Sequence, residues 1–94
     1  MNVKLTHRAL KDLDRLTPSR RLQVLQRLER LEEAPLPDGF QIKRIEGYPQ
    51  GDLYRLRVGS YRVLYVIEAN TVYILRVIPR QDLIKAIRQL RESG

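Results

Sequence analysis

The strongest constraint on the fold is a glycine-serine pair, Gly59-Ser60, that separates two stretches rich in Val, Leu, Ile and Tyr. These stretches run from Leu53 to Val58 and from Tyr61 to Glu68. A two-residue loop between such stretches predicts a β-hairpin, and the length of the loop sets which residues pair across it. Val58 then faces Tyr61, and Arg57 faces Arg62. The rest of the chain has to cover the apolar face of this hairpin.

Other stretches show the same preference for β-branched and aromatic residues. After Ala69-Asn70, which marks the next reversal, a third strand is predicted that Pro79 ends. Together with the hairpin it forms an antiparallel meander, and two shorter strands precede the meander. These additional strands are expected at Thr71 to Ile78, around Ile42 and Ile45, and around Val3 and Leu5 at the opening of the chain.

Helical signals lie in both terminal parts of the chain. Thr6 is predicted to cap a short first helix, and Thr17-Pro18 to begin a second one. A loop at 34–39, with two prolines and a glycine, separates these helices from the strands. The apolar positions are Ala9, Leu10, Leu13 and Leu16 in the first helix, Leu22, Leu25, Leu28 and Leu31 in the second, and Leu83, Ile84, Ile87 and Leu90 in a closing amphipathic helix.

These elements predict an α+β fold in a single domain over residues 1–94, because a chain of 94 residues has room for one modest core. An N-terminal strand and a helical hairpin pack on a small, mainly antiparallel sheet, with a short C-terminal helix. The chain has no cysteine, so we expect neither disulfides nor thiolate chemistry and place the protein in the reducing cytoplasm. No stretch approaches the roughly 20 apolar residues that span a bilayer, so no membrane partner is expected.

The charge of the chain indicates an anionic partner. Lys and Arg total 18 against 11 Asp and Glu, which leaves a formal charge of +7. Such an excess favours binding to polyanions, and arginine offers a planar fork that suits phosphate and carboxylate groups. No histidine and carboxylate cluster has metal-ligand spacing, so we expect no metal and no cofactor.

Alternation along the hairpin sorts its side chains onto two faces. One face is apolar, whereas Arg55, Arg57 and Arg62 emerge on the other. Arg57 and Arg62 are directly opposed, and like charges at opposed positions destabilise a sheet. The acidic residues Asp52 and Glu68 lie only at strand ends. An external anion therefore explains the cluster better than internal pairing does.

Two arginines of the last strand extend this set. Arg80 follows the strand directly, where its side chain can lean over the arginine face, and Arg76 shares its parity with Arg80. Any one of these arginines taken alone is most simply a solvated side chain on an outward face. Three on one face favour a functional site.

At this point the chain resembles a known family. The stretch Leu53-Tyr54-Arg55-Leu56-Arg57-Val58-Gly59-Ser60-Tyr61-Arg62-Val63-Leu64-Tyr65, followed by Val77-Ile78-Pro79-Arg80, is similar to the core signature of the RelE toxins in the RelE/ParE superfamily. The resemblance extends over nearly the whole chain and implies a RelE-like fold.

The resemblance also implies an activity and partners. RelE toxins are metal-independent, ribosome-dependent endoribonucleases that cut translated mRNA, and a cognate antitoxin silences them. By position, Arg55, Arg57, Arg62 and Arg80 match the family's catalytic basic residues, and we add Arg76 as a further RNA contact. The implied partners are a RelB-type antitoxin, in a hetero-oligomer, and the ribosome with its mRNA. The antitoxin is expected to cover the apolar stripe between and beside the helices.

Two other functions remain open at this stage. A ParE-like toxin has the same fold but inhibits DNA gyrase without chemistry of its own. A basic RNA-binding module holds RNA without cleaving it. Retention of all four basic positions favours the ribonuclease, whereas arginines at the first-strand positions, where the best-known RelE toxins have lysines, keep the binding module open.

Overall fold

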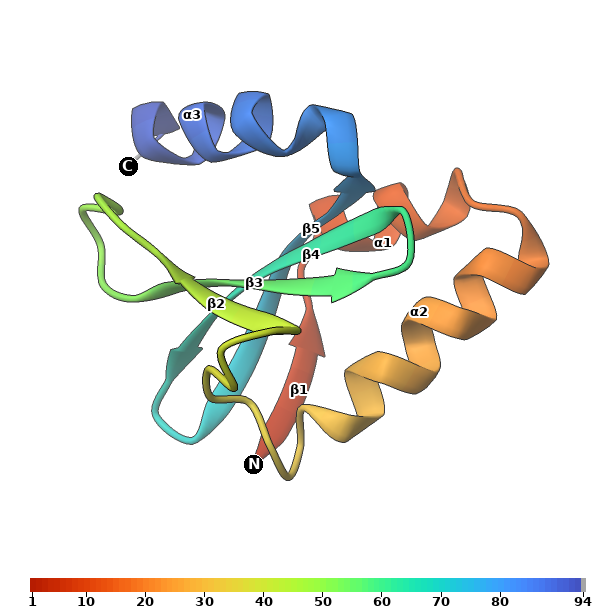
Figure 1. Cartoon of the computed structure of the whole chain (residues 1–94), viewed down its shortest axis with the longest axis horizontal. Coiled ribbons are helices and arrows are strands. Elements are labelled where there is room, and N and C mark those ends of the chain that lie inside the picture. Colours follow the sequence, from red (N-terminus) through yellow and green to blue (C-terminus); the bar gives the residue numbers. More distant parts are fainter. Residues whose placement is uncertain (94) are drawn as a thin grey trace.

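The computed structural model, which describes residues 1–93, has a five-stranded sheet at its centre, in the order β1-β5-β4-β3-β2. Strand β1 is parallel to β5, and all other neighbours are antiparallel. The α+β architecture is therefore as predicted (Figure 1). In chain order the elements are β1 (Asn2–Leu5), α1 (His7–Asp14), α2 (Pro18–Arg30), β2 (Ile42–Ile45), β3 (Leu53–Val58), β4 (Tyr61–Glu68), β5 (Thr71–Pro79), a 3-10 turn (Arg80–Asp82) and α3 (Leu83–Ser93).

The central hairpin has the predicted register. Val58 pairs with Tyr61 and Arg57 with Arg62, and the pairing continues to Leu53 opposite Val66. Gly59 has a φ of +56°, a left-handed conformation that glycine adopts without steric penalty. A two-residue loop with this backbone matches the right-handed twist of the strands, which explains why the turn determines the register.

The helix starts follow the predicted caps. The Thr6 hydroxyl accepts a hydrogen bond from the N–H of Ala9 at 3.3 Å, and the Thr17 hydroxyl accepts one from Arg20 N–H at 3.4 Å. Thr6 also donates to the carbonyl of Ile74 at 2.7 Å, which attaches the start of α1 to β5. None of the helices within residues 1–93 combines the length and the apolar character needed to cross a lipid bilayer.

The sheet separates two apolar clusters. Helices α1 and α2 cover one face, and α3 covers part of the other (Figure 1). The second face is the one that carries the arginines, so α3 shares it with them. The cluster under α1 and α2 contains Ala9, Leu13, Val24, Leu28, Leu31, Leu56, Val63, Tyr65 and Ile74, and the cluster under α3 contains Leu53, Leu64, Ile78, Ala86 and Ile87.

Some residues predicted to be buried in the helices are exposed. Leu22 is 56% exposed and Ile84 is 68% exposed, whereas Val24, absent from the predicted apolar face, is 1% exposed. The reason is geometric: three residues turn an α-helix by about 300°, so a repeat of three drifts around the axis. Leu22 and Leu31 thus lie on opposite sides of α2, while Val24, Leu28 and Leu31 have the spacing of one face.

Candidate functional site

The hairpin turn holds one arginine in a fixed position. Arg62 is only 7% exposed, and its Nη1 donates to the carbonyl oxygens of Gly59 and Tyr61 at 2.9 Å each. Both acceptors are neutral backbone groups of the same turn. The guanidinium is therefore oriented by the turn, but its charge is not neutralised by it.

Three other arginines surround Arg62. Arg57 lies directly opposite Arg62 on β3, and Arg55 lies two residues before Arg57 on the same strand. Arg80 is brought in by its backbone N–H, which donates to the carbonyl of Ser60 at 2.8 Å and so attaches the 3-10 turn to the hairpin turn. The structure thus brings together the four arginines that the sequence singled out as catalytic.

The pKa values of Arg62 and Arg55 reflect their burial and the nearby positive charges. Burial lowers the pKa of Arg62, and the charges of Arg55, Arg57 and Arg80 lower it further. Burial also lowers the pKa of Arg55, with a smaller contribution from Arg57, while Asp38 acts in the opposite direction. The charge of Arg62 is therefore felt together with those of the other three guanidiniums.

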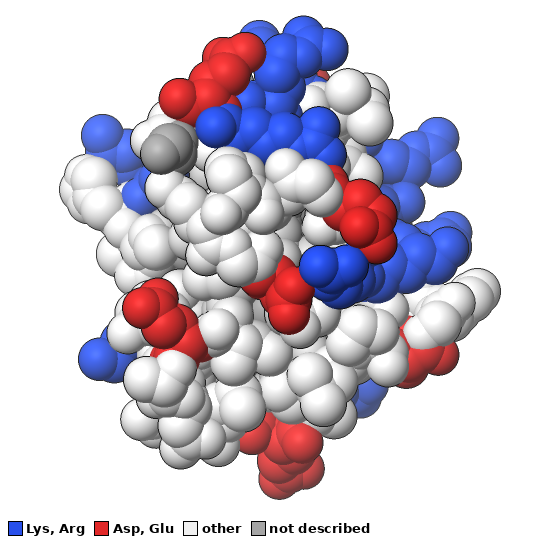
Figure 2. Space-filling model, turned by 90° about the vertical axis from the view of Figure 1, so that its left-hand side faces the viewer, with Lys and Arg blue, Asp and Glu red and all other residues white. Residues whose placement is uncertain are grey.

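Among residues 1–93, no carboxylate forms a salt bridge with this group, which we call the arginine cluster (Arg55, Arg57, Arg62 and Arg80). Within residues 1–93, the salt bridges join Arg44 to Glu46 and Asp52, and Arg76 to Asp12. Asp52, one of the acids at the strand ends, is therefore engaged by Arg44 at 2.9 Å. Elsewhere on the surface, acidic and basic side chains adjoin one another around a wide area without charged side chains (Figure 2). The arginine cluster lacks such compensation, which makes it a candidate anion site.

Arg76 does not join the arginine cluster. Its Nε donates to the carboxylate of Asp12 at 2.8 Å, and its Nη2 donates to the same carboxylate at 3.3 Å. Arg76 pairs with Leu64 of β4, next to a register shift between Leu64 and Tyr65. On the other side of β5, the pairing with β1 ends at Ile74. Since the side chain of Arg76 is engaged in this pair and only 12% exposed, we leave Arg76 out of the candidate site.

The tyrosines of the hairpin lie elsewhere. Tyr54 and Tyr65 stack on each other in the core under α1 and α2, with ring centroids 5.5 Å apart. The Tyr65 hydroxyl donates to the carbonyl of Pro35 at 2.6 Å, and burial raises the pKa of Tyr65 well above its usual value. Tyr48 packs against the cluster under α3. Tyr54 and Tyr65 thus lie on the opposite face of the sheet from the arginine cluster, and the Tyr48 hydroxyl donates to Gln50 at 2.8 Å.

Sequence reasoning missed an aromatic residue beside the site. Phe40 is 63% exposed, and the guanidinium of Arg57 lies 5.8 Å from the centre of its ring. The signal was available, because Phe40 is the only phenylalanine of the chain and follows a loop rich in proline and glycine. Sequence reasoning also missed Arg27 and Arg30 of α2, which line a cavity next to Arg57.

The arrangement suits one chemical task above others. Guanidinium groups clamp phosphate oxygens and stabilise negative charge that develops on them, and they are poor proton acceptors. Among residues 1–93, no group of three or more histidine, aspartate or glutamate side chains is arranged to hold a metal ion. The candidate site therefore consists of fixed positive charge.

Comparisons with known proteins agree on one group of toxins. Residues 3–84 match a family model described as the ParE toxin of the type II toxin-antitoxin system parDE. A candidate toxin from Methanocaldococcus jannaschii, named RelE1, is 37% identical over 83 residues, which cover 86% of this chain and 90% of that protein.

Solved structures point the same way. The archaeal RelE-RelB complex from Pyrococcus horikoshii contains a chain that is 33% identical, with a TM-score of 0.71 and coverage of 84% of this chain and 93% of that one. The toxin-antitoxin complex RelBE2 from Mycobacterium tuberculosis contains one that is also 33% identical, with a TM-score of 0.72 and coverage of 84% and 96%. The resemblance noted in the sequence and the three-layer fold are thus both matched by known proteins.

Proposed function

The chain belongs to the RelE/ParE superfamily of toxins from type II toxin-antitoxin systems, and from this premise we propose that it is a ribosome-dependent endoribonuclease that cuts translated mRNA in the cytoplasm. The observation that carries the proposal is the arginine cluster, in which four guanidiniums gather without a salt bridge to any carboxylate of the described residues. A phosphodiester of RNA supplies the anion that such a cluster requires.

The proposed reaction uses the 2′-hydroxyl of the message as the nucleophile. Its oxygen attacks the adjacent phosphorus as its proton is removed, the bond from phosphorus to the 5′-oxygen breaks, and the 5′-oxygen takes up a proton from water. The products carry a 2′,3′-cyclic phosphate and a 5′-hydroxyl. Arg62, oriented by two backbone carbonyls, stabilises the charge that develops on the phosphate. Arg55, Arg57 and Arg80 hold the neighbouring phosphate oxygens.

Dependence on the ribosome follows from what the cluster lacks. Guanidiniums are poor general bases, so another group must accept the proton of the 2′-hydroxyl. We propose that the decoding site provides this acceptor and also holds the message in the bent geometry that in-line attack needs. Free RNA then binds to the cluster but is not cut.

We propose that an antitoxin of the RelB type silences the protein in a hetero-oligomer. The related toxins from P. horikoshii and M. tuberculosis were solved as complexes with their antitoxins, which supports this proposal. Acidic side chains of the antitoxin would pair with the arginine cluster and so compete with RNA.

One observation favours a second function. The matching family model is that of ParE, so inhibition of DNA gyrase without cleavage is the alternative. A gyrase inhibitor needs no fixed cluster that clamps phosphate, and for this reason we prefer the ribonuclease.

Primer extension on mRNA from induced cells tests the proposal. We expect cuts at codon positions in translated messages only, lost in the double variant Arg62→Ala, Arg80→Ala. Arg8→Ala with Lys11→Ala is the matched control, because it removes two exposed cations of α1, which covers the opposite face of the sheet from the cluster. Intact messages in growth-arrested cells, together with supercoiling activity lost by purified gyrase, would overturn the proposal in favour of the ParE-like function.

A further inference from the structure

A second basic feature lies on the other side of β3. A groove of about 310 Å³ separates α2 from the end of the hairpin, and we call it the α2 groove. Its volume is at the lower end of the range for small-molecule sites. The residues that matter for the argument are Gln23, Gln26, Arg27 and Arg30 of α2, together with Gln41 and Arg57.

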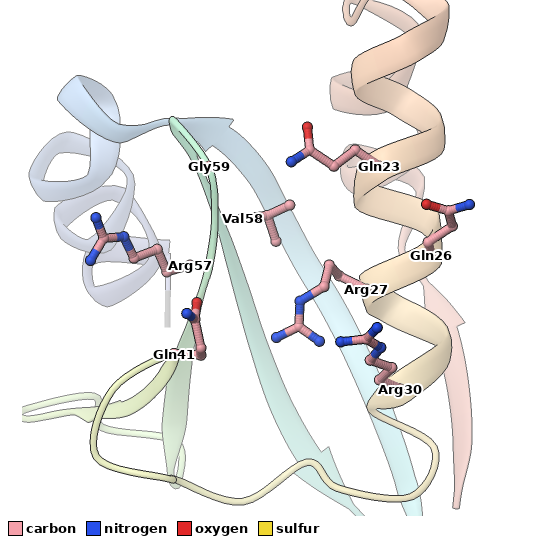
Figure 3. Close-up of a pocket in the computed structure, with 8 residues that line it drawn as sticks. All are labelled: Gln23, Gln26, Arg27, Arg30, Gln41, Arg57, Val58 and Gly59. Carbon is pink, nitrogen blue, oxygen red and sulfur yellow. The ribbon is translucent and has the colours of Figure 1, made fainter.

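The α2 groove is positively charged and has no internal counter-charge. No aspartate or glutamate lines it, and within residues 1–93 neither Arg27 nor Arg30 forms a salt bridge. In Figure 3 both side chains extend from α2 into the space in front of the strands, and Gln23 points toward the turn at Gly59. Residues three, four and seven apart share one face of a helix, so α2 presents amides and guanidiniums together.

Arg57 connects the α2 groove to the arginine cluster. Its backbone lines the groove, and its guanidinium points to the opposite side of the strand (Figure 3). Its N–H donates to the carbonyl of Gln41 at 2.8 Å, which fixes the segment before β2 against β3. A strand of RNA that leaves the arginine cluster can thus pass around the sheet edge at Gln41, beside Arg57, and enter the α2 groove.

Phe40 stands at this edge. Its side chain is 63% exposed, so the ring is open to a partner. The ring is carried on a braced loop, because the Asp38 carboxylate accepts hydrogen bonds from the N–H groups of Ile42 and Phe40 at 2.9 Å each. A fixed, exposed aromatic ring beside an arginine is the arrangement on which single-stranded bases stack.

We infer that Phe40 and the α2 groove form a second RNA subsite, which binds a nucleotide next to the one that is cut; this inference rests on the proposed function. The base stacks on Phe40, Arg27 and Arg30 hold the flanking phosphate, and the glutamine amides face the polar edges of a base. An acidic peptide would use the arginines but would leave the glutamines and the ring without a role. RNA uses all three.

The subsite is tested by binding and by cleavage with the same variants. Fluorescence anisotropy with a labelled single-stranded RNA of eight nucleotides measures affinity without the ribosome, and cleavage on programmed ribosomes measures kcat and KM. We expect Arg27→Ala with Arg30→Ala to weaken RNA binding about tenfold and to reduce the salt slope by about 0.7, since the single flanking phosphate that these arginines neutralise contributes about 0.7 on a single strand. KM should rise by a similar factor, with kcat unchanged.

Phe40→Ala should weaken RNA binding by about tenfold without altering the salt slope, because stacking contributes affinity without ion release. Phe40→Tyr keeps an aromatic ring at this position and should therefore bind RNA as the wild type does. The control variant Arg8→Ala, Lys11→Ala should bind RNA with less than a threefold loss. Circular dichroism confirms that each variant is folded.

The outcomes separate this inference from the proposed function. If wild type cuts no message but the α2 groove variants still lose RNA affinity, the subsite stands and the ribonuclease proposal fails. If Arg62→Ala, Arg80→Ala abolishes cleavage while the α2 groove variants bind and cut RNA as wild type does, the subsite is wrong. Unchanged RNA affinity with lost binding to poly-glutamate would assign the groove to an acidic protein and would also overturn the inference.

Discussion

Two largely buried arginines on neighbouring strands have opposite surroundings. Arg76 on β5 is paired with Asp12, and the side chains are 12% and 4% exposed. Arg62 on β4 is 7% exposed, donates only to backbone carbonyls and has three other arginines around it. The same residue type therefore has two different settings: Arg76 belongs to an internally neutral pair, and Arg62 belongs to the proposed anion site.

The location of each arginine explains the difference. Asp12 also accepts a hydrogen bond from the N–H of Val77 at 2.9 Å, so it satisfies the edge of β5 beyond the end of β1. A buried backbone donor without a partner is costly, and Asp12 supplies that partner as well as the counter-charge. The hairpin turn around Arg62 offers only neutral carbonyls, so the positive charge there faces solvent or a ligand.

The largest expected effect is the loss of stability when the ion pair between Arg76 and Asp12 is broken. Asp12→Ala leaves Arg76 charged without a partner and Val77 N–H without an acceptor, and breaking a buried pair in this way costs about 3–5 kcal/mol. Thermal unfolding should shift downward by at least about 10 °C, since 1 kcal/mol corresponds to roughly 4–8 °C in a domain of this size.

Asp14→Ala is the matched control, because Asp14 lies two residues further along α1 and is exposed. Its unfolding free energy should change by less than about 0.5 kcal/mol. Equal melting temperatures for the two variants would show that the ion pair adds nothing to stability, and the contrast with Arg62 would then fail.

The next largest effect concerns anion binding at the arginine cluster around Arg62. Sulfate carries as much negative charge as two phosphodiester groups and should bind the arginine cluster. A sulfate concentration ten times the Kd then stabilises the fold by about 1.4 kcal/mol. Thermal melts in sodium sulfate against sodium chloride at matched ionic strength measure this difference. Arg62→Ala, Arg80→Ala should abolish it, whereas an undiminished sulfate effect would place the anion site elsewhere.

The smallest effect is the stability change from removing Arg62 alone. Arg62→Met gives up two hydrogen bonds to carbonyls but relieves repulsion among the four guanidiniums, so the two contributions largely offset and the net change should stay below about 1 kcal/mol. Urea unfolding at low salt measures it. A loss as large as that of Asp12→Ala would mean that Arg62 is structural, and the distinction between the two arginines would disappear.

Much of the arginine cluster could be predicted because its geometry is local. A two-residue turn sets the pairing across a hairpin, and alternation then decides the face of every side chain. Arg55, Arg57 and Arg62 needed nothing else, and Arg80 followed because Pro79 ends the adjacent strand. The helices were predicted less well, since a leucine every third residue suggested a face that drifts around the axis and left Leu22 exposed.

What the sequence by itself determined is the hairpin, its register, the helix caps and the gathering of basic residues, because each depends on neighbours along the chain or on a turn of known length. What only the tertiary structure decided is the pairing of Arg76 with Asp12, which are 64 residues apart, the sharing of the arginine face with α3, and the α2 groove beside Phe40. These features arise where distant elements pack, and parity within one strand carries no information about which helix or carboxylate will arrive from elsewhere in the chain.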